Sequence, residues 1–81
     1  MKNLRNRIVA LVDKAVKDTD KEVMILRTFY DDASDRAFIT LVKGRRKVNL
    51  TFSGRDAREQ TENITSIIKT GIEKLSRVPI G

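Results

Sequence analysis

Six basic side chains in the middle of the chain have the chemistry of phosphate contacts. They form two groups separated by a short segment with alternating apolar residues, and they are Lys43, Arg45, Arg46, Lys47, Arg55 and Arg58. Lysine and arginine donate charge-assisted hydrogen bonds to phosphate oxygens, and such contacts supply most of the affinity of nonspecific nucleic-acid binding. We therefore predict that these six residues contact the phosphates of duplex RNA or DNA.

The charge of the whole chain agrees with an anionic partner. Its 81 residues include 17 Lys and Arg against 11 Asp and Glu, a formal net charge of +6. Residues 36–58 carry seven basic and one acidic side chain, so the excess is concentrated around the candidate contacts. A patterned excess of this kind favours a polyanion. A basic turn can also be no more than a solvated surface, and the sequence leaves this second interpretation open.

The residue inventory leaves little room for catalysis. Without histidine or cysteine the chain has no imidazole base, no thiolate nucleophile and no disulfide. Residues 66–69 and 69–71 match two motifs of serine acyl-transferases, but they overlap inside one predicted helix, whereas that chemistry needs them on separate elements. We predict that the protein is not an enzyme, and that it has no catalytic residue, no cofactor and no small-molecule substrate.

Three carboxylates, those of Asp31, Asp32 and Asp35, lie close together in the sequence. Carboxylate oxygens are ligands of hard cations, but this spacing does not match an EF-hand loop and lacks its glycine and terminal glutamate. We predict a solvated acidic turn and no metal site.

Hydrophobic spacing predicts the elements that must position these residues. Apolar residues recur at helical spacing over 3–18, which predicts an amphipathic helix. Residues 23–30 and 37–42 are rich in β-branched and aromatic side chains and predict two strands joined by the acidic turn. Val48, Leu50 and Phe52 alternate with polar residues and predict a third strand after a turn at Gly44.

A second helix is predicted to begin after Ser53 and to end before Pro79. Ser53 is a plausible N-cap, and Asp56 three residues later gives a variant of the capping box. The apolar stripe of this helix is formed in its second half by Ile64, Ile67, Ile68, Ile72 and Leu75. The first half is nearly all polar, so we expect it to project past the core or to face a partner.

These elements predict an α+β fold of order α-β-β-β-α, in which two helices pack on one face of a three-stranded antiparallel meander. We expect one domain over residues 1–81, with a short tail at 78–81. A five-residue third strand would separate the two basic groups by about 17 Å, on the scale of phosphate rows that flank a groove. One duplex would then touch both groups.

The first two strands carry apolar residues at consecutive positions, so both of their faces are apolar. Val23, Ile25 and Phe29 alternate with Met24, Leu26 and Tyr30. Two helices cover only one face, and an exposed apolar patch is typical of an interface. We predict a homodimer. An alternative function follows from the same argument: the chain could be a protein–protein adaptor or assembly subunit that works through the sheet face around Met24, Leu26, Phe38 and Val42, or through the face of the opposite register.

Aromatic residues are few, and this argues against binding single strands by base stacking. The chain has three phenylalanines, one tyrosine and no tryptophan. We expect most of these four residues, Phe29, Tyr30, Phe38 and Phe52, to be in the core, so duplex backbone recognition suits the composition better.

We expect a cytoplasmic protein without a membrane partner. The N-terminal apolar run over 8–12 stops at Asp13 and is too short for a signal peptide. No stretch approaches the roughly 18 apolar residues of a membrane span.

The predicted order of elements resembles the double-stranded-RNA-binding domain, a family with the same order at about this length. Residues 53–58 resemble the family signature Ser-Lys-Lys-x-Ala-Lys at the start of its last helix, where basic residues grip phosphates across the major groove. On this resemblance, Arg55 and Arg58 would be phosphate ligands and Ala57 a packing residue. Gly54 stands in place of the first lysine.

The chain departs from the family pattern at two places. The family's loop between its first two strands enters the minor groove with a Gly-Pro-x-His type sequence, whereas here residues 31–35 carry three carboxylates that repel phosphate. The small alanines of the family's last helix are replaced by Thr61, Ile64, Ile67 and Ile68. The resemblance therefore implies the fold over most of the chain, and phosphate contacts through Arg55 and Arg58.

Overall fold

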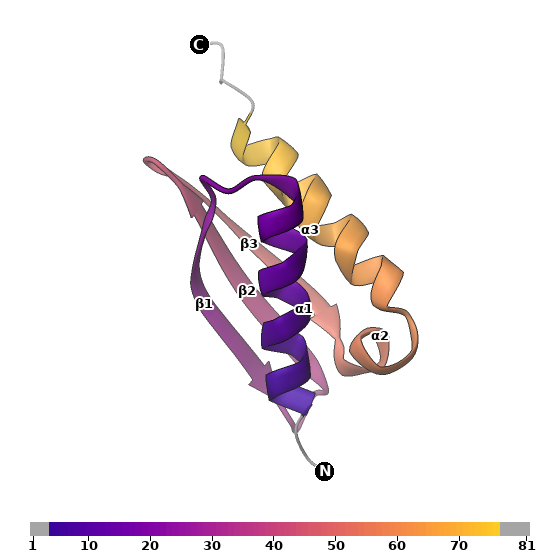
Figure 1. The fold of residues 1–81 in the computed structure, drawn as a ribbon. Coiled ribbons are helices and arrows are strands. Elements are labelled where there is room, and N and C mark those ends of the chain that lie inside the picture. The colour runs from indigo at the N-terminus through magenta and orange to yellow at the C-terminus, as the bar shows by residue number, and fades with distance from the viewer. Residues whose placement is uncertain (1–3, 77–81) are drawn as a thin grey trace.

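The computed structural model describes residues 4–76, which form one three-stranded sheet and three helices (Figure 1). The helices are α1 (Leu4–Thr19), α2 (Gly54–Glu59) and α3 (Thr61–Ser76), and the strands are β1 (Met24–Asp31), β2 (Arg36–Lys43) and β3 (Arg46–Ser53). The strands are antiparallel in the order β1-β2-β3. The prediction of an α+β meander is confirmed, and the predicted tail at 78–81 lies outside the described residues.

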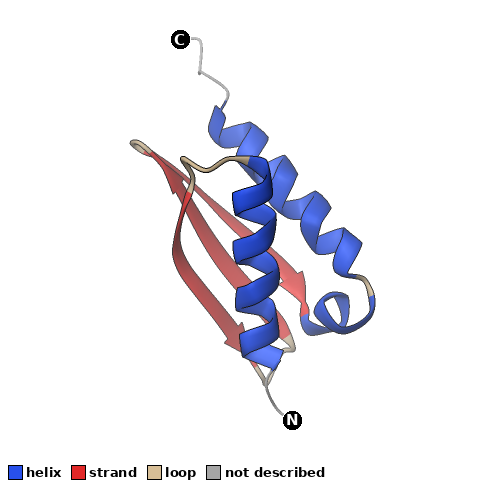
Figure 2. Ribbon diagram, in the orientation of Figure 1, coloured by secondary structure: helices blue, strands red, loops and turns tan. Residues whose placement is uncertain are grey.

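Helices α1 and α3 lie side by side on one face of the sheet (Figure 2). Each helix presents its apolar stripe to the inward side chains of the strands, because helical and strand periodicities place those residues on one face. The largest fully buried side chains come in pairs from α1, β2 and α3: Ile8, Val12, Ile39, Leu41, Ile64 and Ile68. The opposite face of the sheet is covered by no described element, and we call it the open face.

A β-bulge in β1 determines which side chains reach the open face. Ile25 pairs with Leu41 and Arg27 with Thr40, so Leu26 is an extra residue without a partner. Because side chains alternate strictly along a strand, one extra residue reverses the assignment of every later position. Our prediction that Phe29 shares a face with Ile25 is therefore wrong: Phe29 lies on the open face, and Tyr30 turns to the helix side.

The predicted single C-terminal helix is also wrong, because it is broken at Gln60 (φ −134°, ψ 56°) into α2 and α3. The predicted capping box is present at the start of α2: Ser53 Oγ accepts from the Asp56 amide at 3.1 Å, and the Asp56 carboxylate accepts from the Ser53 amide at 3.4 Å. The break lets both Ala57 and Ile64 be buried while Arg58–Gln60 are exposed. Helices in proteins are stabilised mainly by packing of an apolar face. The polar segment Arg58–Gln60 has no such face, so no packing against the core keeps the helix continuous through it.

Helix α3 approaches β3 closely at Gly71. A Cβ atom at this position would lie 2.7 Å from Leu50 Cδ1 and 3.2 Å from its Cγ, closer than carbon atoms pack. Gly71 is buried, and its missing side chain lets the helix axis come near the sheet.

We expect Gly71→Val to destabilise the fold by about 1–3 kcal/mol, the usual cost of overpacking a core. Valine has a slightly better helix propensity than glycine, so propensity does not explain a loss. Thr70→Val places the same side chain one residue earlier, on the exposed side of α3, and should leave stability nearly unchanged. Urea unfolding of the two variants measures the difference. Equal stabilities would show that Leu50 moves aside freely.

Candidate nucleic-acid interface

The structure places the six predicted basic residues at opposite ends of the sheet. Lys43, Arg45, Arg46 and Lys47 surround the turn between β2 and β3, whereas Arg55 and Arg58 lie on α2 at the far end (Figure 1). The strand between them has eight residues instead of the predicted five, so the groups are about 27 Å apart instead of 17 Å. They do not form one compact site.

Two of the turn residues point to the helix layer and form contacts within the fold. Lys43 and Arg46 face each other in the ladder, on the side of the sheet that α3 covers. Lys43 Nζ lies 2.7 Å from an Asp20 carboxylate oxygen, and this hydrogen bond raises the pKa of Lys43 and lowers that of Asp20. Arg46 donates at 3.3 Å to the Leu75 carbonyl, one of the free carbonyl groups at the end of α3.

The other two turn residues are available to a partner. Arg45 and Lys47 are exposed, and neither forms an ion pair or hydrogen bond with any residue from 4 to 76. Gly44 adopts φ +62°, a conformation that glycine tolerates and that makes the turn tight. Since the side chain of Lys43 points inward, the alternation of β3 places that of Lys47 on the open face.

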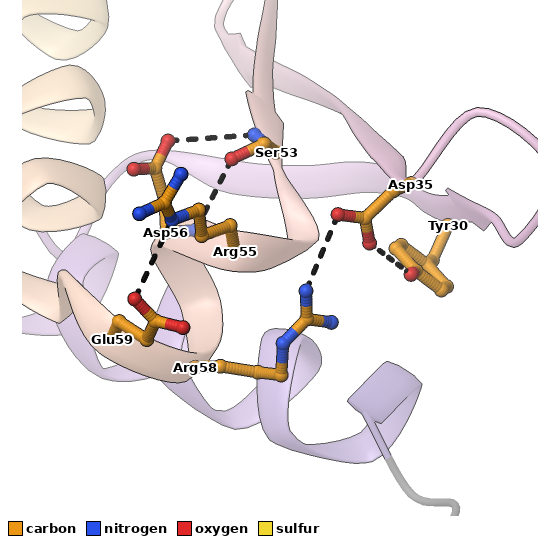
Figure 3. Close-up of polar contacts among 7 residues, drawn as sticks. All are labelled: Tyr30, Asp35, Ser53, Arg55, Asp56, Arg58 and Glu59. Atoms are coloured by element: carbon orange, nitrogen blue, oxygen red, sulfur yellow. Dashed lines mark hydrogen bonds and ion pairs between the residues drawn. The ribbon is translucent and has the colours of Figure 1, made fainter.

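Both arginines of α2 have acidic partners within the chain (Figure 3). Arg55 pairs with Glu59 one helical turn later at 3.4 Å, and Arg58 pairs with Asp35 at 3.4 Å. Tyr30 also donates its hydroxyl to Asp35. This hydrogen bond, followed by the ion pair with Arg58, lowers the pKa of Asp35. The acidic turn therefore lies against the start of α2.

The same carboxylate explains the glycine at the start of α2. A Cβ atom at Gly54 would collide with the Asp35 carboxylate and would lie 2.9 Å from the Tyr30 hydroxyl. The resemblance to the double-stranded-RNA-binding domain calls for a lysine at this position, and the fold has no room for one without displacing Asp35. A phosphate at this end of the molecule would lie near the Asp35 carboxylate, which already forms contacts within the fold.

A second carboxylate of the turn, that of Asp31, forms hydrogen bonds within the turn itself. Asp31 accepts from the Ala33 amide at 3.2 Å and from the Ser34 hydroxyl at 2.8 Å, which is typical of an Asx turn. Asp35 adopts φ 55°. Among residues 4–76, no group of three or more acidic side chains is placed to hold a metal ion.

The open face carries two candidates that our prediction did not name, Arg27 and Phe29, beside Phe38, which it placed in the surface of the alternative adaptor function. Phe29 and Phe38 are 38% and 43% exposed, with ring centroids 6.1 Å apart and an interplanar angle of 28°. Arg27 Cζ lies 5.5 Å from the centre of the Phe29 ring. The expectation that most aromatic residues are in the core is wrong, because only Phe52 is buried and Tyr30 is half-buried.

The predicted apolar surface on this face is present. Met24 is 70% exposed and Leu26 66% exposed, and Val42 is half-buried beside them. These three residues form an apolar patch at the end of the open face nearest the β2–β3 turn, and Phe38 lies nearer the middle of the same face. The prediction of a homodimer rests on this patch and stays a prediction.

Neither protein-family models nor curated protein sequences nor solved structures match this chain. The function is therefore argued from the surface itself. Within residues 4–76, no helix combines the length and the apolarity needed to cross a bilayer.

We expect Asp35→Asn to lower the melting temperature at neutral pH, with an effect that shrinks in acid. Asparagine tolerates the left-handed backbone of Asp35 but loses the charge. Because the folded pKa of Asp35 is lowered, its stabilisation is complete above the pKa of an unfolded aspartate, about 3.9, and is lost as the pH falls through the folded pKa. Thermal melts at a series of pH values measure this.

Asp32→Asn is the matched control for that experiment. Asp32 is exposed in the same turn and forms no ion pair or hydrogen bond with the described residues, so its replacement removes the same charge without the contacts. An equal loss of melting temperature in both variants would contradict a structural role for Asp35.

Proposed function

We propose that this protein is a small non-catalytic nucleic-acid-binding domain that contacts phosphates through the turn between β2 and β3. The observation that carries the proposal is the state of Arg45 and Lys47, which are exposed and have no acidic partner among residues 4–76. Arg46 lies beside them, and its charge is not neutralised because its partner is a carbonyl group. Three positive charges are therefore concentrated at one end of the molecule.

The distribution of charge over the fold supports an anionic partner for the sheet. The strands carry five basic residues, Arg27, Arg36, Lys43, Arg46 and Lys47, and one acidic residue, Asp31. The other ten acidic residues lie in the helices and turns. This segregation makes the sheet the positive layer of the molecule.

The two arginines of α2 contribute less to the proposed interface than the sequence predicts. The Arg55–Glu59 pair is exposed, and such pairs contribute little stability, so Arg55 can exchange Glu59 for a phosphate at low cost. Arg58 would have to release Asp35, which also holds Tyr30. A duplex that contacts both ends of the sheet would thus engage Arg55 more readily than Arg58.

A second candidate function is supported by the apolar patch. Exposed Met24 and Leu26 favour a protein partner or a second copy of this chain, and this would make the protein an adaptor or assembly subunit. Sedimentation at high micromolar concentration separates the two functions in part, because a monomer would rule out a second copy as the partner of this patch. In either case we propose a location in the cytoplasm.

We expect 20-nucleotide RNA and DNA, single-stranded or duplex, to bind at 50 mM salt and to be released as salt rises. Arg45 and Lys47 supply two phosphate contacts, which predict that the affinity falls about 7- to 12-fold between 50 and 200 mM salt. Replacing both residues by alanine removes these contacts and predicts an affinity that hardly depends on salt. Fluorescence anisotropy at several salt concentrations gives both slopes.

The control variant combines Lys14→Ala with Lys69→Ala. These exposed lysines line a shallow groove between α1 and α3, on the side of the molecule away from the open face, and their removal costs the same charge. It should keep the steep salt dependence of the unmodified protein. Absence of binding at 50 mM salt by every one of the four nucleic acids would refute the proposed function.

A further inference from the structure

The open face is organised in rows of side chains that cross the three strands. In the central row, Phe29 pairs with Phe38 and Phe38 with Thr51. These cross-strand neighbours project in the same direction, so the two rings lie together at the middle of the face. A groove runs over them, with Arg27 and Asn49 also in its lining.

The rings form a platform of the size that a base needs. Both residues are more than one third exposed, and the ring planes are inclined by only 28°, so the two rings lie nearly parallel at the surface. Bases stack on exposed aromatic rings without regard to sequence, because every base has a π face. The Arg27 guanidinium lies over the Phe29 ring, and a guanidinium plane can itself stack on a base, so Arg27 is part of the platform.

The next row supplies hydrogen-bonding groups. It joins Arg27, Thr40 and Asn49 across the strands. Thr40 donates its hydroxyl to Asn49 Oδ1 at 2.8 Å, which fixes the amide and leaves its two N–H groups without a partner among residues 4–76. Amide N–H groups at this position can donate to the edge of a base that stacks on the neighbouring row.

The charges on this face are arranged for a phosphate backbone. Lys47 lies at one end of it, beside the exposed Arg45 of the turn, and Arg36 lies at the other end. The groove over the rings has no acidic residue in its lining, and Asp31 at the Arg36 end is the acidic residue of the strands. A single strand of nucleic acid that crosses the rings therefore runs between the positive charges of Lys47 and Arg36.

A second copy of this chain is a poorer occupant. Three strands about 4.8 Å apart and about 27 Å long give a face of roughly 400 Å², half of the about 800 Å² per partner that specific interfaces bury. A two-fold dimer would also bring together two faces that each carry Arg27, Arg36 and Lys47. A duplex fits no better, because its bases are stacked on each other and cannot reach the rings.

From this geometry we propose that the open face binds single-stranded nucleic acid, with bases stacked on Phe29 and Phe38 and the backbone directed toward Arg45 and Lys47. This inference rests on the proposed function and names its ligand as the single strand. It differs from the sequence-based prediction of duplex recognition because the two rings are on the surface.

The test compares two double variants of the open face by fluorescence anisotropy with a 20-nucleotide single strand, as RNA and as DNA. Phe29→Ala with Phe38→Ala removes the platform and should weaken binding at least fivefold, and up to about 150-fold if stacking on one base is lost completely. Met24→Ala with Leu26→Ala removes a similar apolar surface from the same face without touching the rings, and should change binding less than twofold. Circular dichroism verifies that both variants fold.

Two further measurements separate stacking from charge and from apolar contact. A single strand of the same length with abasic sites keeps the phosphates and should bind at least fivefold more weakly than the intact strand. Phe38→Trp introduces the only tryptophan in a chain that has none. Its fluorescence should be quenched when the single strand binds, with affinity retained.

The outcomes distinguish this inference from the proposed function. Binding of single strands that survives loss of both phenylalanines, or equal affinity for intact and abasic strands, would overturn the stacking platform and leave phosphate contact by the turn standing. Preference for duplex over single strand would overturn it as well. A concentration-dependent dimer that is abolished by Met24→Ala with Leu26→Ala would assign the face to a second copy. Absence of binding to any nucleic acid would refute both proposals together.

Discussion

Two helices can cover only one face of a three-stranded sheet, and the other properties of this molecule follow from that limit. The helix side takes up the fully buried residues, including Ile8 of α1, Ile39 of β2 and Ile68 of α3. The open face is left with side chains that a larger fold would bury, above all Phe29 and Phe38. Exposed aromatic rings at the centre of a positive sheet lower solubility, and the proposed contact with an anionic ligand that has π faces would account for their exposure.

Strand alternation divides the basic residues between structure and binding. Lys43 and Arg46 point toward the helices, where they hold Asp20 and the end of α3, whereas Lys47 points to the open face and Arg45 to solvent. At the other end of the sheet, Asp35 holds Tyr30 and Arg58 and excludes a side chain at Gly54. The molecule thus has one end whose charges are internally balanced and one end whose charges are not.

The sequence predicts the fold class and most element positions because the helical stripe of α1 and the alternation of β3 have clear periods. It does not predict the phase of β1, since residues 23–26 are all apolar and an unbroken apolar run gives no alternation from which a bulge at Leu26 could be read. The break at Gln60 is indicated by the sequence, because the residues between Ala57 and Ile64 are all polar and no apolar stripe continues through them. The candidate site was predicted in part: Arg45 and Lys47 are available and Phe38 was placed in an exposed apolar surface, whereas Arg27 and Phe29 depend on the register of the bulge and were missed.

The most direct test of the account is an NMR titration of the ¹⁵N-labelled protein with a single-stranded oligonucleotide at low salt. The account predicts that the largest shifts fall on open-face residues and the adjoining turn, namely Arg27, Phe29, Phe38, Asn49, Arg45 and Lys47, while α1 and the exposed side of α3 are unaffected. Shifts confined to α2 and the acidic turn, or to the helical side, would contradict the assignment of the open face as the binding surface.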